Sequence, residues 1–227
     1  MSEALEKLGI YDLMAVLLSG VCITTFSLLA DPVLFQSQLS NFVKVEETIA
    51  FLVISYFIGL VFQEIGSFIY KKLIHLDKKI LKKVLDASND TSLTLTQEEK
   101  DGIEEAVRAQ LGLKTVLDND TLYNCCKFHL ISSGNVVRAD KDQSTSGLSR
   151  SLSLFFFILA IITAWSAISA QNVAYFVYAV SEVVLSCLLY YRCRRFVRMR
   201  YIYILRSFYY SYLQNKPGNG ANDSRAK

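Results

Sequence analysis

Four blocks of apolar residues, separated by polar stretches, constrain this chain more than any other feature. The blocks cover residues 13–30, 48–70, 154–170 and 173–191. A helix of about 20 residues crosses a hydrocarbon layer of roughly 30 Å, and each block has about that length. The blocks therefore predict an all-α, polytopic membrane protein with four transmembrane helices.

Basic residues indicate which side of the membrane each connection faces. Six lysines closely follow the second block, and six arginines closely follow the fourth. The two other connections, 31–47 and 171–172, contain one basic residue, Lys44. Because cytoplasmic segments next to a span carry an excess of lysine and arginine, both termini and the segment 72–149 are predicted to be cytoplasmic.

The same pattern divides the chain into five segments. The cytoplasmic segment is predicted to form a small helical domain, since its apolar residues recur at a helical period. The segments are a transmembrane hairpin at 1–71 (spans 13–30 and 48–70), the cytoplasmic helical domain at 72–149, a second transmembrane hairpin at 150–191 (spans 154–170 and 173–191), a basic aromatic juxtamembrane helix at 192–213 and a disordered tail at 214–227.

Three helices are predicted in the cytoplasmic part. Apolar residues at a helical period after the second span predict that this span continues as one helix to Asp86. Thr96 and Glu99 match a capping box, in which the two side chains cap the first turn, so a helix over 97–111 follows. A further helix is predicted over about residues 121–132.

Two acids, Glu64 and Glu182, and one side-chain amide, Gln63, fall within the predicted spans. A carboxylate near the bilayer centre costs about 3 kcal/mol on insertion scales, while the Val, Leu and Phe residues of the fourth span return about 4.5 kcal/mol together. Because that margin is narrow, Glu182 is predicted to face protein rather than lipid. Two interpretations follow: the acids line an ion or proton path, or they form hydrogen bonds between packed helices.

Small residues recur at steps of three or four along the spans. They let helix backbones approach closely in a lipid environment. The pattern is typical either of packing within one four-helix bundle or of an interface between subunits, including one that lines a pore. These residues are Gly20, Thr24, Ser55, Gly59, Gly66, Ala160, Ala164 and Ala167.

The stretch after the fourth span interleaves arginines with aromatic residues. Arginines beside a span attract anionic lipid headgroups, and tyrosines favour the membrane interface, so the stretch predicts a membrane anchor. The same pattern fits a helix that docks a soluble protein partner, whereas nucleic acid is disfavoured because the arginines lie so close to the headgroups. The predicted headgroup or partner contacts are Arg192, Arg194, Arg195, Arg198, Arg200 and Arg206.

The predicted cytoplasmic segment carries no pattern of catalytic or cofactor-binding residues. It contains no glycine-rich nucleotide loop, no Ser-His-Asp arrangement and no metalloprotease helix. Cys125 and His129 share a helical face, but the second half of a zinc signature is missing. The chain is therefore expected not to be an enzyme and to hold no metal or cofactor, with Cys125 and Cys126 serving as small buried residues.

Two stretches stand out within the four-span layout: residues 56–66, Tyr-Phe-Ile-Gly-Leu-Val-Phe-Gln-Glu-Ile-Gly, and the arginine- and tyrosine-rich tail over 194–212. With these stretches and a helical insert between its spans, the chain resembles in layout the membrane component of Kiwa-type bacterial anti-phage defence systems. That resemblance implies a homo-oligomeric sensor or effector of the bacterial inner membrane that works with a cytoplasmic protein partner. It carries over no site residues.

Two functions from different classes remain open. In the first, the spans oligomerise through their small residues, and the cytoplasmic helices with the tail recruit a soluble protein, which makes the chain a membrane sensor or scaffold. In the second, Gln63, Glu64 and Glu182 line a gated ion-permeable pore that depolarises the membrane. A pore requires subunits that close around these side chains, whereas a scaffold requires only packing.

Overall fold

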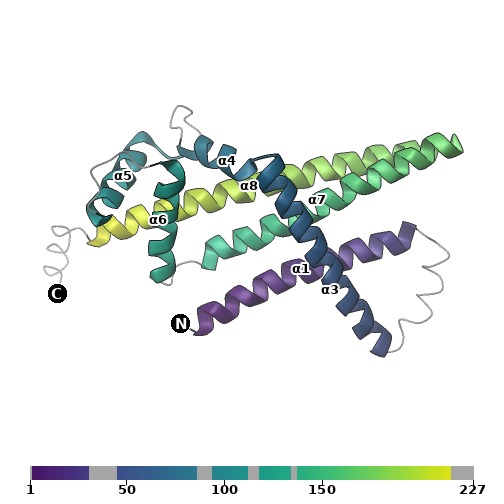
Figure 1. Cartoon of the computed structure of the whole chain (residues 1–227), viewed down its shortest axis with the longest axis horizontal. Coiled ribbons are helices and arrows are strands. Elements are labelled where there is room, and N and C mark those ends of the chain that lie inside the picture. Colours follow the sequence, from purple (N-terminus) through teal and green to yellow (C-terminus); the bar gives the residue numbers. More distant parts are fainter. Residues whose placement is uncertain (1, 31–44, 86–93, 112–117, 134–136, 216–227) are drawn as a thin grey trace, which may run out of the picture.

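The computed structural model describes residues 2–30, 45–85, 94–111, 118–133 and 137–215 as a set of helices (Figure 1). These ranges contain no strand, so the predicted all-α class is confirmed. The tail predicted to be disordered lies outside the described ranges from residue 216 onward. The elements are α1 (Ser2–Ala30), α3 (Val45–Phe68), the π-helical turn η1 (Ile69–Leu73), α4 (Leu76–Leu85), α5 (Gln97–Leu111), α6 (Asn119–Ser132), α7 (Val137–Ala170) and α8 (Val173–Asn215).

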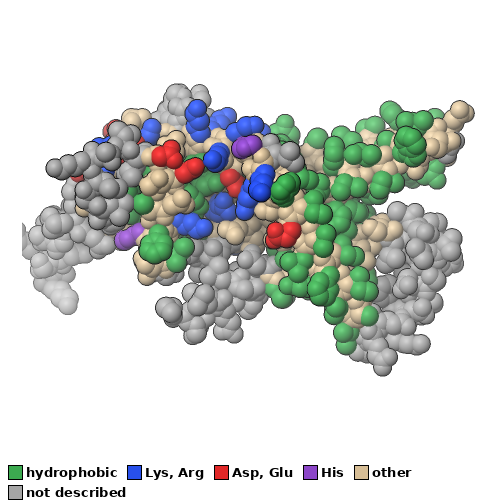
Figure 2. All heavy atoms as spheres, viewed as in Figure 1, with side chains coloured by type: hydrophobic (Ala, Val, Ile, Leu, Met, Phe, Trp, Pro, Cys, Tyr) green, Lys and Arg blue, Asp and Glu red, His purple; other side chains and the backbone are tan. Residues whose placement is uncertain are grey.

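Three helical stretches are long and apolar enough to cross a membrane: Thr48–Lys72, Lys141–Ser169 and Val173–Gln214. A further apolar stretch, Leu13–Ser27 in α1, is shorter. Many large apolar side chains on α3, α7 and α8 are exposed, as is expected where lipid replaces water. Figure 2 shows apolar side chains gathered over one half of the molecule and charged side chains over the other half. The chain thus has the surface of a membrane protein.

The helices α7 and α8 pack against each other as a long antiparallel pair (Figure 1). Gln171 between them adopts a positive φ of 49°. The Asn172 side-chain oxygen accepts a hydrogen bond of 2.9 Å from the Ala174 amide and so caps the start of α8. Two residues are therefore enough to reverse the chain.

The helices α1 and α3 cross at a point where each has a glycine, so that their backbones come into direct contact. Gly20 on α1 lies against the carbonyl of Ser55, and Gly59 on α3 lies against the carbonyl of Val16. The Ser55 hydroxyl donates a hydrogen bond of 3.2 Å to the Thr24 hydroxyl across the crossing. These small residues therefore bring two helices of one chain together. Both helices also pack on α7, where Ala160 and Ala167 are buried and Ala164 is half-buried.

The prediction that the second span continues as one helix to Asp86 was wrong. The helix α3 ends at Phe68, the wider turn η1 follows, and His75 has a positive φ of 52° before α4 begins. The bend lets Leu76, Ile80 and Val84 of α4 be buried against the other helices. Apolar periodicity alone did not indicate the break, because no glycine or proline marks it.

The helices α4, α5 and α6 gather around the second half of α8 (Figure 1). We call α4, α5, α6 and residues 192–215 of α8 the helical domain. The helix predicted over 97–111 has those bounds in α5, and the one predicted from about residue 121 begins two residues earlier, in α6. Core residues of this domain include Leu81, Val84, Ile103, Val107, Leu122, Cys126, Val197, Leu205 and Phe208.

Gly20→Ala is expected to destabilise the protein although alanine is the better helix former. A Cβ at position 20 would overlap the Ser55 carbonyl. Overpacking of this kind costs about 1–3 kcal/mol, which exceeds the gain of about 1 kcal/mol or less in helix propensity. The melting temperature of the full chain in mild detergent should therefore fall.

Gly147→Ala is the matched control. Its added Cβ would meet only the flexible Gln63 side chain, at 3.2 Å, so the melting temperature should stay the same or rise slightly. Equal melting temperatures for the two variants would contradict a close crossing of α1 and α3.

Candidate functional site

The helix α8 connects the lipid-facing surface with the core of the helical domain. It is 43 residues long and has no break. In its first half, Val177 and Leu188 are 60% and 61% exposed, whereas in its second half Val197 and Leu205 are buried. The sequence analysis considered the tail as a membrane anchor or as a docking helix. In the structure its apolar face forms the centre of the helical domain.

A set of buried hydroxyls joins three elements where the spans approach the helical domain. The Tyr70 hydroxyl of η1 donates a hydrogen bond of 2.9 Å to Ser153 of α7. The Ser153 hydroxyl donates to the Ser186 carbonyl of α8 at 2.9 Å, and the Ser186 hydroxyl donates back to the Ser153 carbonyl at 2.8 Å. The sequence analysis did not single out Ser153 or Ser186. The density of serines over residues 144–153 was the available signal for Ser153.

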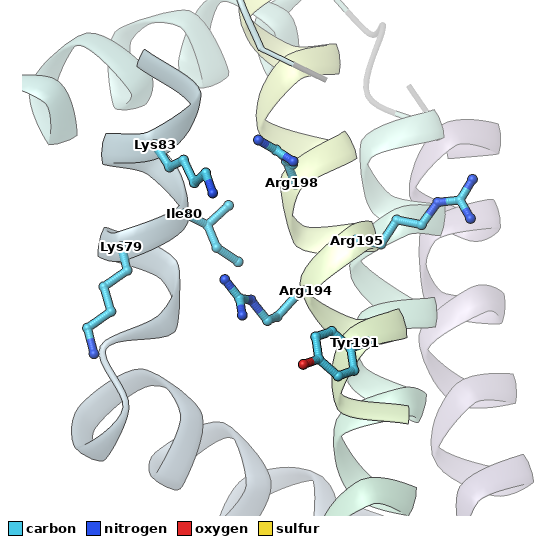
Figure 3. A pocket seen from close by; sticks show the side chains of 7 residues that line it. All are labelled: Lys79, Ile80, Lys83, Tyr191, Arg194, Arg195 and Arg198. Atoms are coloured by element: carbon cyan, nitrogen blue, oxygen red, sulfur yellow. The ribbon is translucent and has the colours of Figure 1, made fainter. Parts of the chain in front are cut away.

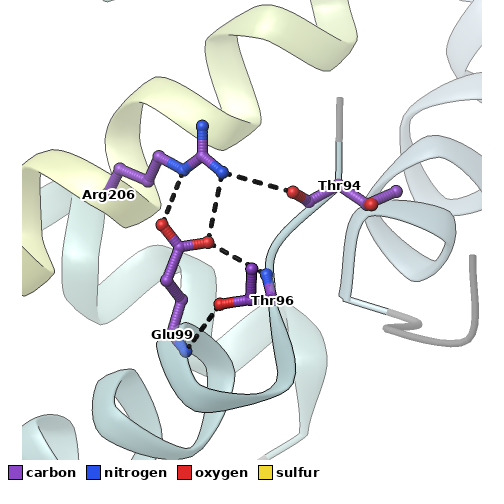
Figure 4. A network of polar contacts seen from close by, with 4 residues as sticks. All are labelled: Thr94, Thr96, Glu99 and Arg206. Atoms are coloured by element: carbon purple, nitrogen blue, oxygen red, sulfur yellow. Dashed lines mark hydrogen bonds and ion pairs between the residues drawn. The ribbon is translucent and has the colours of Figure 1, made fainter. Parts of the chain in front are cut away.

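An ion pair between Glu99 and Arg206 ties α5 to α8 (Figure 4). The Arg206 Nε lies 2.9 Å from Glu99 Oε1, and its Nη2 donates to Glu99 Oε2 at 3.2 Å and to the Thr94 carbonyl at 3.3 Å. The same carboxylate accepts a hydrogen bond of 2.9 Å from the Thr96 amide, while the Glu99 amide donates to the Thr96 hydroxyl at 3.2 Å. The predicted capping box is therefore present, and Arg206 is engaged inside the helical domain.

A basic pocket lies between α4 and α8 (Figure 3). In each helix two of its cations are four residues apart and so share one face. Figure 3 shows Lys83 and Arg194 reaching into the space between the helices, whereas Arg195 points away from α4. The pocket has a volume of about 380 Å³ and is lined by Lys79, Ile80, Lys83, Tyr191, Arg194, Arg195 and Arg198.

The six tail arginines lie in different environments. Three of them line the basic pocket, and Arg206 pairs with Glu99. Arg200 lies over the Tyr201 ring at 5.2 Å and donates a hydrogen bond of 3.3 Å to Gln143. Arg192 is exposed and lies 5.6 Å from the centre of the Phe196 ring. The tail is therefore not one uniform charged surface.

The three intramembrane polar residues do not form one cluster. Gln63 approaches Gly147 of α7, and Glu64 is exposed on α3. Glu182 on α8 lies close to Thr163 of α7. Its Oε2 is buried and has no hydrogen-bond partner among the residues that the structure describes. Within one chain Glu182 thus contacts a neighbouring helix, and Glu64 is open to lipid or to a second subunit.

The cysteines of α6 lie in two environments. Cys126 is completely buried, and burial raises the pKa of its thiol to about 12. A thiol that stays protonated is a poor metal ligand. Cys125 and His129 line a groove on α6 beside Phe128. Across the described parts of the chain, no group of three His, Cys, Asp or Glu residues is placed to hold a metal ion.

Comparison with known families, curated proteins and solved structures finds no match to this chain. The contribution of Lys79 and Lys83 to the basic pocket was not foreseen from the sequence, which used these lysines only to assign topology. Their spacing of four on an amphipathic helix was the available signal, but it could not place α4 beside α8.

Glu99→Gln is expected to destabilise the protein by about 1–3 kcal/mol, because it removes a charge-assisted bond from a half-buried pair. The thermal stability of the full chain in mild detergent measures this loss. Glu104→Gln is the matched control on the same helix. Glu104 pairs with Arg108 at 3.5 Å with both side chains partly exposed, so its loss should cost only about 0.5 kcal/mol or less.

The effect of Glu99→Gln should also depend on pH. Burial alone would raise the pKa of the Glu99 carboxyl, but its bonds from the Thr96 amide and the Arg206 guanidinium outweigh burial and hold the pKa below its ordinary value. A lowered pKa stabilises the folded state above the unfolded value, and that stabilisation is lost as pH falls through the folded value. The advantage of the wild type should thus shrink below about pH 4. An advantage that stays constant to lower pH would contradict this assignment.

Proposed function

We propose that the protein is a membrane-bound sensor or scaffold that holds a small helical domain at the cytoplasmic face of the membrane, forms homo-oligomers and recruits a soluble protein partner. The observation that carries the proposal is the continuity of α8. A helix of this length extends about 65 Å, which is enough to cross a bilayer and form the centre of a domain beyond it. A displacement of the span is therefore passed directly to the helical domain.

The cytoplasmic placement is supported by the position of the basic residues. The lysines of α4 and the arginines of α8 belong to the helical domain, at the same end of the spans. Lysine and arginine beside spans favour the cytoplasmic side. A bacterial inner membrane and a role in anti-phage defence are part of the proposal on the resemblance in layout alone.

A surface on α6 supports the recruitment of a partner. Phe128 is 75% exposed and Ile131 is 51% exposed, although both belong to the helical domain rather than to the spans. Phe128 also lines the groove with Cys125 and His129. Exposed apolar side chains beside a groove are typical of protein–protein contact surfaces.

Phe128→Ser should weaken recruitment of the partner by about tenfold or more, the effect expected for an aromatic anchor. Since the side chain is exposed, the stability of the chain itself should change by about 0.5 kcal/mol or less. Soluble proteins retained by membranes that contain the full chain are compared between wild type and variant. Tyr210→Ser, at another exposed aromatic residue of the domain, is the control. Equal retention by both variants would exclude α6 as the recruiting face.

An ion-permeable pore is the second candidate, favoured by the buried and unpartnered Oε2 of Glu182 among the described residues. A second subunit could provide the missing partner or close a path around it. The pore also requires Glu64, which is exposed on α3, to face a lumen between subunits.

Oligomeric mass and ion flux separate the two candidates. For the scaffold we expect a particle in mild detergent that contains several copies of the 25.7 kDa chain and produces no flux in liposomes. Glu64→Gln and Glu182→Gln should then leave recruitment intact. Flux that either substitution changes would instead establish the pore. A monomer would contradict both candidates.

A further inference from the structure

The basic pocket gathers cations that form no ion pair with a described residue, whereas some other charged residues of the helical domain are paired. Arg206 pairs with Glu99 at 2.9 Å, and Lys78, on the same helix as the pocket lysines, pairs with Asp120 at 3.9 Å. Among the described residues, the pocket lining contains five cations, of which Arg195 points away from α4, and no acidic residue. None of these five has an ion pair with any residue in the described ranges. The charge of the pocket is therefore available to a ligand.

The cations of the pocket come from two helices that pack together. Lysines of α4 face arginines of α8, and Ile80 is buried between the two helices. Like charges on facing helices oppose this packing, and an anion placed between them converts the repulsion into attraction. The pocket is thus a place where an anion would bridge α4 and α8.

The depth of the pocket in the membrane is set by α8. Tyr191 is at the end of the predicted fourth span, and Arg198 follows about 10 Å further along the helix axis. The polar headgroup layer on each side of a bilayer is roughly 5–8 Å thick. The pocket therefore opens toward both the headgroup layer and the solution next to it.

The side chains in the pocket are those that recognise phosphate. Guanidinium groups bind two phosphate oxygens at once, and lysine ammonium groups add compact charge. The Arg194 guanidinium is held over the Tyr190 ring at 5.7 Å, which restricts its orientations. The pocket has cations on both helices, so a ligand with two neighbouring phosphates can contact the lysines of α4 and the arginines of α8 at the same time.

We propose that the basic pocket binds an anion that carries two linked phosphate groups and thereby joins α4 to α8. Two sources share this chemistry: the headgroup of cardiolipin, which has two phosphates, and a soluble pyrophosphate compound. The inference names a ligand for the proposed membrane sensor. Binding of a lipid headgroup rests on the proposed placement in a membrane, whereas binding of a soluble pyrophosphate compound does not. Because α4 follows the bend after α3 and α8 contains the fourth span, the ligand connects the two transmembrane hairpins.

The test uses the purified full chain in neutral detergent, without a partner. Binding of inorganic pyrophosphate is measured by calorimetry. Cardiolipin retained after mixing with phosphatidylcholine and cardiolipin micelles is measured by native mass spectrometry. The pocket variant is Lys83→Gln with Arg198→Gln, and the matched control is Lys82→Gln with Arg192→Gln, which removes the same charge from α4 and α8 outside the pocket.

The wild type and the control should bind alike, and the pocket variant should bind roughly 10- to 30-fold more weakly. If the pocket variant loses pyrophosphate binding and the control does not, the ligand is assigned as soluble. If the pocket variant loses cardiolipin and the control does not, the ligand is assigned as a lipid. Equal weakening in both double variants would mean diffuse attraction and overturn the proposal. Absence of binding by the wild type to either probe would overturn it as well.

Folding is checked by melting temperature without ligand. If the pocket variant does not fold, Lys79→Gln with Arg194→Gln replaces it, and the same outcomes apply. Oligomeric mass and partner recruitment are separate measurements, so failure of this site and failure of the proposed function are distinguishable.

Discussion

The structure depends on one constraint: in a lipid environment every backbone amide and carbonyl must be bonded within its own helix. The helix α8 meets this requirement and then continues beyond the predicted span for a total of 43 residues. The helices α4, α5, α6 and α7 pack along it, and α1 and α3 pack on α7. At one end α7 packs beside it through the paired hydroxyls of Ser153 and Ser186. At the other end α4, α5 and α6 cover its apolar face, which places Leu205 and Phe208 in the core.

The arginines of α8 meet groups of different charge on the neighbouring helices. Beside α5, Arg206 meets a carboxylate that also caps that helix, so one glutamate satisfies a helix end and an ion pair together. Beside α4, the arginines meet lysines, and a pocket remains between them. The first contact stabilises the domain by itself. The second leaves a pocket in which the proposed anion would join the two helices.

The crossing of α1 and α3 bears on whether the small residues of the spans can form an interface between subunits. Gly20 and Gly59 are in contact with backbone of their own chain. A homo-oligomer must therefore form through other surfaces of the spans. The exposed apolar residues there include Phe57 on α3 and Trp165 on α7. The interpretation of the glycines as helix-packing residues thus agrees with a scaffold, and a pore would have to be built from a different set of side chains.

The sequence by itself predicted the helical class, four apolar blocks, the bounds of α5 and its capping box, because these follow from local periodicity and from residues three or four apart. Three of the four blocks lie in helical stretches long and apolar enough to cross a membrane, and the first lies in a shorter apolar stretch. Only the tertiary structure decided the bend at His75, the burial of the tail and the pairing of Arg206 with Glu99, which is more than 100 residues away. The basic pocket was likewise decided only by the tertiary structure. Its lysines and arginines were visible as two clusters, but their meeting depends on how α4 packs on α8, and periodicity indicates the faces of helices without indicating which faces meet.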